Sequence, residues 1–339
     1  MKKFLALLLA LAMVMCLFAG CGDTNAPADD TNTPADDTAT PADDTTSTDD
    51  NSQYTIGYAC GDMGLLFDNM LFEAAEKKAN ELGVKFVGMD AQHDNVMQID
   101  QVNGMIAQGI DGLAINLVTT DAAAAVSKAC EEAGVPVVYC NMFPWGDAVE
   151  ENIPEYDYYV GSVEDDAGRL QANYLLELVG DQEVGVCIMQ GVLGSSGALG
   201  RTAGNHEILD PVETVTILDE QTGNWLRDEA TTLAENWITA HGDKLNVILC
   251  NNDEMALGCV NACKAAGRDD IIIMGVDATP DGLAAVKAGD MAATVLQDAT
   301  NQAGHSVENA LKLAKGESVP KVDWIPFVLV TPEDVDQYM

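Results

Sequence analysis

Positively charged residues are scarce in this 339-residue chain, which has 16 Lys and Arg against 55 Asp and Glu. The net charge of −39 would repel a phosphate backbone, so the composition excludes nucleic-acid binding as a function. Such a charge favours solubility but does not identify a partner. With 47% hydrophobic residues, the chain can bury a sizeable core, and two domains are expected from its length.

The chain also lacks the residue patterns of common catalytic and metal sites. Its four His residues are scattered, with neither metal spacing nor a nucleophile partner. The glycine-rich stretch Gly191–Gly200 lacks the spacing of nucleotide-binding loops, and Ser195-Ser196 does not form the hydrolase motif G-x-S-x-G. We therefore expect no enzyme activity, no metal and no cofactor, and we interpret Gly191–Gly200 as a flexible rim of a cleft.

Long apolar runs are missing except at the N-terminus. There Phe4–Phe18 follows Lys2-Lys3 and is too short to span a membrane as a mature helix. It ends in Phe18-Ala19-Gly20-Cys21, which resembles a bacterial lipobox; an ordinary signal peptide with a chance Cys is the alternative. We expect residues 1–20 to be a lipoprotein signal peptide and Cys21 to carry the lipid. This anchor would hold the protein on the extracellular face of a bacterial cell membrane.

The next segment is acidic and almost free of apolar residues. From Asp23 to Asp50 inclusive there are nine Asp residues, and the repeat PADDT begins at Pro27, Pro34 and Pro41. Such a segment cannot bury enough surface to fold, and its charges repel one another. We therefore predict a disordered acidic tether over residues 21–53.

The chain contains nine Cys residues, of which seven remain after Cys16 and Cys21 are set aside. Seven is odd, so at least one thiol is unpaired. Most of these positions lie in apolar strand or helix patterns, which predicts small core residues. Cys259 and Cys263 are four apart on a predicted helix. No His or second Cys pair accompanies them, so we expect no metal there, and their role stays open.

The stretch Val247–Asp277 predicts a strand–helix–strand unit. Its two apolar runs, Val247–Cys250 and Ile271–Val276, end at the polar tips Asn251–Asp253 and Asp277. Buried parallel strands place their carboxyl ends at one edge of a sheet, where open α/β folds bind ligands. The sequence therefore predicts a ligand crevice lined by amides and carboxylates.

The same alternation of strands and helices runs from Tyr54 to Cys140 and, after a crossing segment at Asn141–Asp157, from Tyr158 to Val330. It predicts an α/β fold of two doubly wound parallel-sheet lobes with a cleft between them. Among the predicted helices of the second half are Glu164–Val179, Arg201–Leu209 and Trp225–Ala240.

Several phrases resemble one known family. They are Ala114-Ile115-Asn116-Leu117-Val118, Val135-Pro136-Val137-Val138, Asn251-Asn252-Asp253, Gly275-Val276-Asp277-Ala278 and Thr294-Val295-Leu296-Gln297-Asp298. In order and spacing they resemble the type I periplasmic sugar-binding proteins of ABC transporters, nearest the galactose/glucose-binding branch, over nearly all of Tyr54–Val330. The resemblance implies a three-crossing hinge near Asn141, Gln297 and Pro326. It also implies lobe 1 at 54–142 and 298–325, and lobe 2 at 143–297 and 326–339.

The resemblance further implies a sugar site. Phe67 and Trp225 match the aromatic plates around the sugar ring, and the matching polar ligands are Asn116, Arg201, Asn252, Asp277 and Gln297, the last replacing a family Asn. Three positions depart from the pattern, because Leu65 replaces a carboxylate and Ser195 and Gly197 replace a His and an Asp. The calcium loop of the galactose branch is missing at Gly180–Glu183, which lacks alternating oxygen ligands.

These residue types suit a pyranose, which offers an apolar C–H face and a ring of hydroxyl groups. Other roles stay open: Trp225 as a core residue, Asn252 and Asp277 as helix N-caps, and Arg201 in a surface ion pair. The expected function is capture of a monosaccharide (galactose/glucose-like) by a monomer that delivers it to an ABC permease. A nucleoside, pentose or signalling polyol is the alternative ligand, and a sensory ectodomain for a histidine-kinase receptor is the alternative role.

Overall fold

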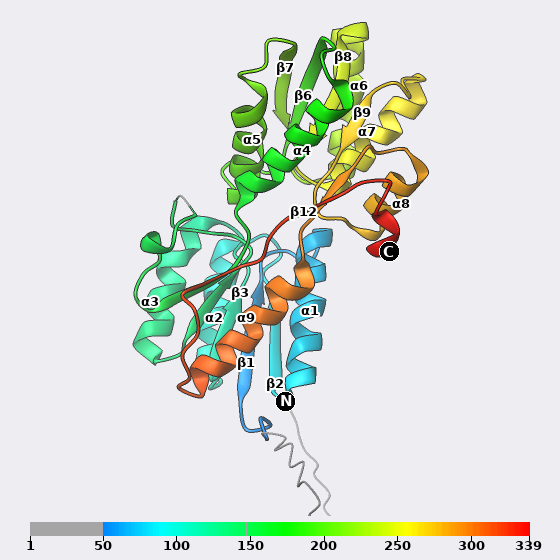
Figure 1. The fold of residues 1–339 in the computed structure, drawn as a ribbon. Coiled ribbons are helices and arrows are strands. Elements are labelled where there is room, and N and C mark those ends of the chain that lie inside the picture. The colour runs from blue at the N-terminus through cyan, green and yellow to red at the C-terminus, as the bar shows by residue number, and fades with distance from the viewer. Residues whose placement is uncertain (1–49, 147) are drawn as a thin grey trace, which may run out of the picture. The chain divides into compact units, whose positions relative to one another are not determined.

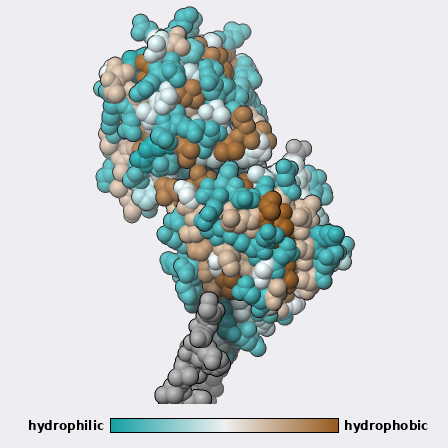
Figure 2. Space-filling model, turned by 180° about the vertical axis from the view of Figure 1, so that it is seen from behind, coloured by the Kyte–Doolittle hydropathy of each residue, from teal (hydrophilic) through white to brown (hydrophobic). Residues whose placement is uncertain are grey.

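The computed structural model describes residues 50–146 and 148–339. Cys21, the expected signal peptide and most of the expected tether lie outside these residues. Within them, no helix is both long enough and apolar enough to cross a membrane. The face shown in Figure 2 is largely hydrophilic, and hydrophobic residues appear on it in small separate groups.

The first sheet, in lobe 1, is parallel throughout, with the strand order β11-β5-β4-β3-β1-β2. Successive side chains of a strand point to opposite faces, so Tyr58 and Ala59 of the buried strand β1 enter two different core clusters. Helices α1 and α9 cover one face, and α2 and α3 cover the other (Figure 1). The bounds are β1 Thr55–Cys60, α1 Leu66–Leu82, β2 Lys85–Asp90, α2 Asn95–Ala107, β3 Gly112–Ile115, α3 Ala123–Ala133, β4 Val137–Cys140, β5 Asp157–Gly161, α9 Ala299–Ala314 and β11 Val322–Trp324.

The second sheet, in lobe 2, has the parallel order β7-β6-β8-β9. Parallel bridges join the β9 region to the β10 region, and β12 pairs antiparallel with β10. Helices α6 and α7 pack on one face, and α4 and α5 pack on the other. The bounds are α4 Glu164–Val179, β6 Val184–Gln190, α5 Ser196–Leu209, β7 Val215–Thr222, α6 Arg227–His241, β8 Leu245–Cys250, α7 Asp253–Ala266, β9 Ile272–Met274, α8 Pro280–Ala288, β10 Thr294–Leu296 and β12 Val328–Val330. The predicted fold class, two doubly wound α/β lobes, is confirmed.

The chain passes between the two sheets at three places. The first passage follows β5, because β5 pairs with β4 in the first sheet. The expected passage near Asn141 was therefore too early, and residues 157–161 belong to lobe 1. The alternation of strands and helices shows that a strand exists but not which sheet it joins. The other passages lie between β10 and α9 and between β11 and β12.

Two helices of lobe 2 begin at residues other than those expected. Helix α5 begins at Ser196, because the hydroxyl of Ser195 accepts a hydrogen bond from the N–H of Ala198 at 3.3 Å. The second half of the expected flexible rim is thus helical. Its glycines allow close packing on α4: a Cβ on Gly200 would lie 2.5 Å from the Cβ of Glu164. Helix α6 begins only at Arg227, so Trp225 precedes the helix.

All seven Cys residues of the described chain are buried and free of disulfide bonds, which confirms the prediction of small core residues. The sulfur atoms of Cys250 and Cys259 lie 3.7 Å apart. Within residues 50–146 and 148–339 no group of three or more His, Cys, Asp or Glu side chains could hold a metal ion.

Candidate functional site

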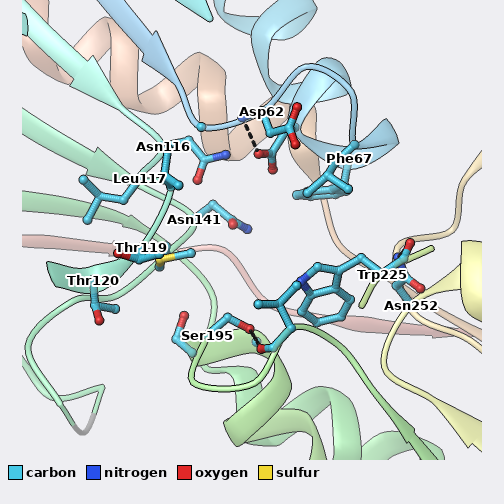
Figure 3. A pocket seen from close by; sticks show the side chains of 18 of the residues that line it. Asp62, Phe67, Asn116, Leu117, Thr119, Thr120, Asn141, Ser195, Trp225 and Asn252 are labelled. Atoms are coloured by element: carbon cyan, nitrogen blue, oxygen red, sulfur yellow. Dashed lines mark hydrogen bonds between the residues drawn. The ribbon is translucent and has the colours of Figure 1, made fainter. Parts of the chain in front are cut away.

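A cavity of about 400 Å³ is lined by residues that follow the strands of both sheets. All seven residues expected to bind the ligand line it, together with the three departures from the family pattern. Figure 3 shows Phe67 and Trp225 on opposing sides of this pocket. The fold therefore brings these residues together, although they are spread over residues 67 to 297 of the chain.

Arg201 organises the lobe 2 wall of the pocket and is only 5% exposed. Its guanidinium donates to Glu164 at 2.8 Å, to the carbonyl of Asn251 at 2.6 Å and to the side-chain oxygen of Gln297 at 2.8 Å. Three of its five N–H groups are therefore bonded to protein, and the fork is fixed in one orientation. The alternative reading of Arg201 as a surface ion pair is wrong.

Glu164 was not singled out from the sequence, yet it is the principal counter-ion of Arg201. It opens α4 directly after the first passage between the lobes, and it is buried. Its second oxygen lies 3.5 Å from the side-chain nitrogen of Gln297, which closes a ring of three side chains. An acidic residue in the first turn is favourable for any helix, so the sequence offered no signal that separated Glu164 from ordinary helix stabilisation.

Asp277 lies at the strand tip where the sequence placed it. Its carboxylate lies 3.6 Å from the Arg201 guanidinium. Its backbone φ is 115°, a value that residues other than glycine rarely adopt. Burial raises the pKa of Asp277 well above its ordinary value, and Arg201 opposes this rise only in part. Such a strained, desolvated carboxylate in a cavity is typical of a functional position. Asp277 does not cap a helix, since Thr279 caps α8.

Asn252 combines two of the roles left open by the sequence. Its side-chain oxygen accepts from the N–H of Met255 at 3.0 Å and so caps α7, while its nitrogen donates to the carbonyl of Trp225 at 3.3 Å. It also lines the pocket. Asn252 therefore fixes the backbone beneath Trp225 as well as facing the cavity.

Trp225 is held against the cavity by its backbone and by a glycine. Its φ is 67°, and a Cβ on Gly191 would lie 2.0 Å from the indole ring, so only glycine fits there. The Arg201 guanidinium lies 5.6 Å from the centre of the indole ring, within cation–π range. The indole also packs against the lobe 2 core, so the core reading of Trp225 and its pocket position both apply.

The lobe 1 wall carries groups that the sequence did not single out. Asp68, one position after Phe67 on α1, accepts a hydrogen bond from the N–H of Asp62 at 3.2 Å (Figure 3). Burial raises the pKa of Asp68 to about 7, and the Asn116 side chain and the Asp62 N–H oppose that rise. Asn141 also lines the wall, with a φ of 67°. The feature of the sequence that could have identified these groups is the acid and amide content of the segments that follow β1 and β4.

The arrangement can bind a small hydroxylated molecule. Phe67 and Trp225 provide apolar faces, and carboxylates, amides and a guanidinium surround them. Among the described residues no group of three or more His, Cys, Asp or Glu side chains could hold a metal ion, and the Cys side chains are buried.

Comparison with known proteins agrees with this geometry. The family model described as periplasmic binding protein domain matches residues 56–318. A Rhizobium meliloti protein described as rhizopine-binding is 38% identical over 289 residues, which cover 84% of this chain and 92% of the relative. The D-galactose/methyl-galactoside binding periplasmic protein of Haemophilus influenzae is 30% identical, with 80% and 88% covered. An ABC transporter solute binding protein from Bacillus halodurans, solved with bound myo-inositol, has a TM-score of 0.78 and 33% identity, with 86% and 98% covered.

Proposed function

This chain belongs to the periplasmic binding protein domain family, and we propose that its pocket captures a small polyhydroxylated ring for delivery to an ABC permease. The observation that carries this proposal is the Arg201–Glu164–Gln297 frame beside the aromatic plates Phe67 and Trp225. The plates suit the C–H face of a ring. The frame holds hydrogen-bonding groups at fixed positions around its edge, which reduces the ordering cost of binding.

The ligand class is broader than the expected galactose or glucose. The relatives named for rhizopine and for galactose are 38% and 30% identical to this chain. A solved structure with bound myo-inositol is 33% identical. The lobe 1 rim of this chain has Leu65 where the sugar branch has a carboxylate, and Leu65 lines the pocket. We therefore include cyclitols alongside hexoses.

Delivery follows from binding across two lobes. A ligand that contacts both walls stabilises the form in which both walls reach it, and that form would be the one recognised by a permease. The protein would act as a monomer, tethered through Cys21 on the extracellular face of the cell membrane. Binding rather than catalysis is the activity that the pocket supports.

Isothermal titration calorimetry against hexoses, pentoses, inositol isomers and nucleosides tests the proposal. We expect a hexose or a cyclitol to bind with a dissociation constant in or below the micromolar range, about −8 kcal/mol or better. Preferential binding of a nucleoside would contradict the ring-polyol assignment. Turnover of a bound ligand, followed by mass spectrometry, would contradict the binding-protein assignment.

A further inference from the structure

A buried carboxylate lies behind the lobe 2 wall of the pocket. Asp253 is the first residue of α7 and is 0% exposed, and it does not line the cavity, although its neighbours Asn252 and Glu254 do. Burial of a carboxylate is costly unless donors reach it, so its position needs an explanation. Capping of α7 does not supply one, because Asn252 already caps that helix.

Asp253 joins three segments of lobe 2. One oxygen of its carboxylate accepts hydrogen bonds from the N–H of Thr279 at 2.8 Å and from the hydroxyl of Thr279 at 3.2 Å. The other oxygen accepts from the hydroxyl of Thr294 at 2.6 Å, and the N–H of Asp253 donates to the carbonyl of Val276 at 2.7 Å. One residue thus links α7 to β10 and to the segment between β9 and α8.

The segment between β9 and α8 contains two consecutive residues with a positive φ. Asp277 has a φ of 115° and Ala278 has a φ of 54°, and neither is a glycine. Such a backbone conformation persists only where surrounding contacts hold it. The residues on either side, Val276 and Thr279, are the ones that bond to Asp253. Their contacts with Asp253 therefore hold both ends of the strained pair.

A further contact reaches the strained pair itself. The Thr294 hydroxyl that donates to Asp253 also accepts from the N–H of Ala278 at 3.3 Å. The space around the carboxylate leaves it little freedom. A Cβ on Gly275 would lie 2.2 Å from one of its oxygens, and a Cβ on Gly282 would lie 2.1 Å from the other. Close packing and hydrogen bonds together fix the carboxylate in one position.

We propose that Asp253 is a positioning residue for ligand binding, which holds residues 276–279 in the conformation that keeps the Asp277 carboxylate at the pocket wall. Asp277 lines the cavity 3.6 Å from the Arg201 guanidinium, so a change in its backbone moves an acceptor of the pocket. A ligand hydroxyl that donates to Asp277 needs that acceptor at a fixed place. The inference rests on the proposed function, because it concerns how the same pocket holds its ring polyol.

Two substitutions of Thr294 test the contact without removing a charge. Thr294→Val deletes the hydroxyl that joins Asp253 to Ala278, whereas Thr294→Ser keeps it. Calorimetry uses myo-inositol, D-glucose and D-galactose as probes. For the probe that the wild type binds most tightly, we expect the dissociation constant to rise about tenfold in Thr294→Val and to return to within about threefold of wild type in Thr294→Ser. Wild-type affinity in Thr294→Val, or equal losses in the two variants, overturns the inference.

Asp253→Asn tests whether the effect passes through Asp277. We expect this substitution to raise the same dissociation constant about tenfold, but by about twofold or less when it is combined with Asp277→Ala, because no carboxylate is then left to position. Equal losses in both backgrounds overturn the inference.

Asp157→Asn is the matched control for Asp253→Asn. Asp157 is also buried and also accepts from a hydroxyl, that of Ser127 at 2.6 Å, but it lies in lobe 1 and does not line the pocket. We expect Asp157→Asn to bind the probe as the wild type does. A loss equal to that of Asp253→Asn overturns the inference, because any buried carboxylate would then have the same effect.

Hydrogen exchange of the ligand-free protein gives a readout that does not depend on the ligand, and it decides the matter where Asp277→Ala binds too weakly for calorimetry. The amides of residues 276–283 should exchange about tenfold faster in Thr294→Val and in Asp253→Asn than in wild type, while those of α5 keep their rates. Unchanged exchange at 276–283, or an equal increase in α5, overturns the inference.

The outcomes separate this inference from the proposed function. Binding of a probe by the wild type, with unchanged affinity and exchange in the variants, overturns the inference and leaves the proposed function standing. Absence of binding of all three probes by the wild type overturns both. Thr294→Val alone carries the test if circular dichroism shows that Asp253→Asn is unfolded.

Discussion

The two walls of the pocket differ in how their polar groups are satisfied. On lobe 2, Arg201 bonds to Glu164 and Gln297. On lobe 1, Asp68 lacks an ion-pair partner among the described residues, and its polar neighbours are the Asn116 side chain and the N–H of Asp62. On the lobe 2 wall the protein itself pairs the side chains of Arg201, Glu164 and Gln297, whereas on the lobe 1 wall no cation of the described residues pairs with Asp68.

This difference separates affinity from specificity. A completed frame is already ordered, so little conformational entropy is lost when a ligand arrives. The Asp68 carboxylate, which has no cation beside it on the other wall, penalises any ligand that buries it without a donor, which makes it the better discriminator. We therefore expect substitutions of the frame to affect folding and all ligands, and substitutions of lobe 1 to change the choice among ligands.

The largest effect is expected from Arg201→Met. It leaves Glu164 and Asp277 buried without a cation, so the free energy of unfolding should fall by about 3–5 kcal/mol. Binding of every polyol should be lost. Arg169→Met is the control, because Arg169 also bonds to two carboxylates, Glu207 and Asp166, but on the surface. This control should lower the free energy of unfolding, measured by urea denaturation, by about 1 kcal/mol or less. Similar losses for the two variants would contradict the description of the frame.

Trp225→Ala should have the next largest effect, on binding. Loss of the indole face removes apolar contact with the ring, and we expect affinity to fall by about 2 kcal/mol, or about thirtyfold, for every ring polyol that binds. Trp324→Ala is the control, since Trp324 stacks on Phe143 and does not line the pocket. Calorimetry of both variants measures the difference. A loss confined to one ligand class would show that Trp225 discriminates, contrary to the comparison of the walls.

Asp68→Asn should stabilise the free protein in a pH-dependent manner. Burial raises the pKa of Asp68 to about 7, so the folded protein retains a proton that the unfolded chain has released. The wild-type stability contribution of this group therefore declines as the pH rises from about 4 to about 7. The variant should gain on the order of 1 kcal/mol over wild type near pH 8 and much less near pH 5.

Thermal unfolding of the ligand-free protein at both pH values measures this gain, with Asp100→Asn as the control. The negative charges of Asp62 and Asp90 also raise the pKa of Asp68 and so favour its protonated form. A variant less stable than wild type near pH 8 would mean that the carboxylate is satisfied without a ligand.

The smallest effect is expected far from the pocket, at His206 on α5. Its ring lies 2.9 Å from Asp210 and 2.6 Å from Glu220. Burial lowers the pKa of His206, but the hydrogen bonds to Glu220 and Asp210 outweigh it, so the pKa is raised overall. The stabilisation is thus fully present below the ordinary His pKa and is lost as the pH rises through the raised value. His206→Gln should lower the free energy of unfolding by a few tenths of a kcal/mol near pH 6 and by about nothing near pH 9. Ligand binding should be unchanged. A change in binding would link this surface to the frame.

Part of the site could be predicted because local pattern and parallel-sheet geometry both pointed to it. Asn252 and Asp277 follow apolar strands, and parallel strands bring such tips to one edge. Glu164 and Asp68 escaped prediction because each occupies an ordinary position in the first turn of a helix. The role of Glu164 comes from a contact across the chain, its bond to Arg201, which is 37 residues away.

The sequence by itself determined the fold class, the family, the strand tips and seven of the residues that line the pocket, since these depend on periodicity, composition and short phrases. Only the tertiary structure decided which lobe receives β5, because strand pairing is non-local. It also decided that Trp225 stands before its helix with a positive φ, and which carboxylates of the pocket have a cation and which do not. Electrostatic pairing depends on distance and burial, and the linear order of residues encodes neither directly.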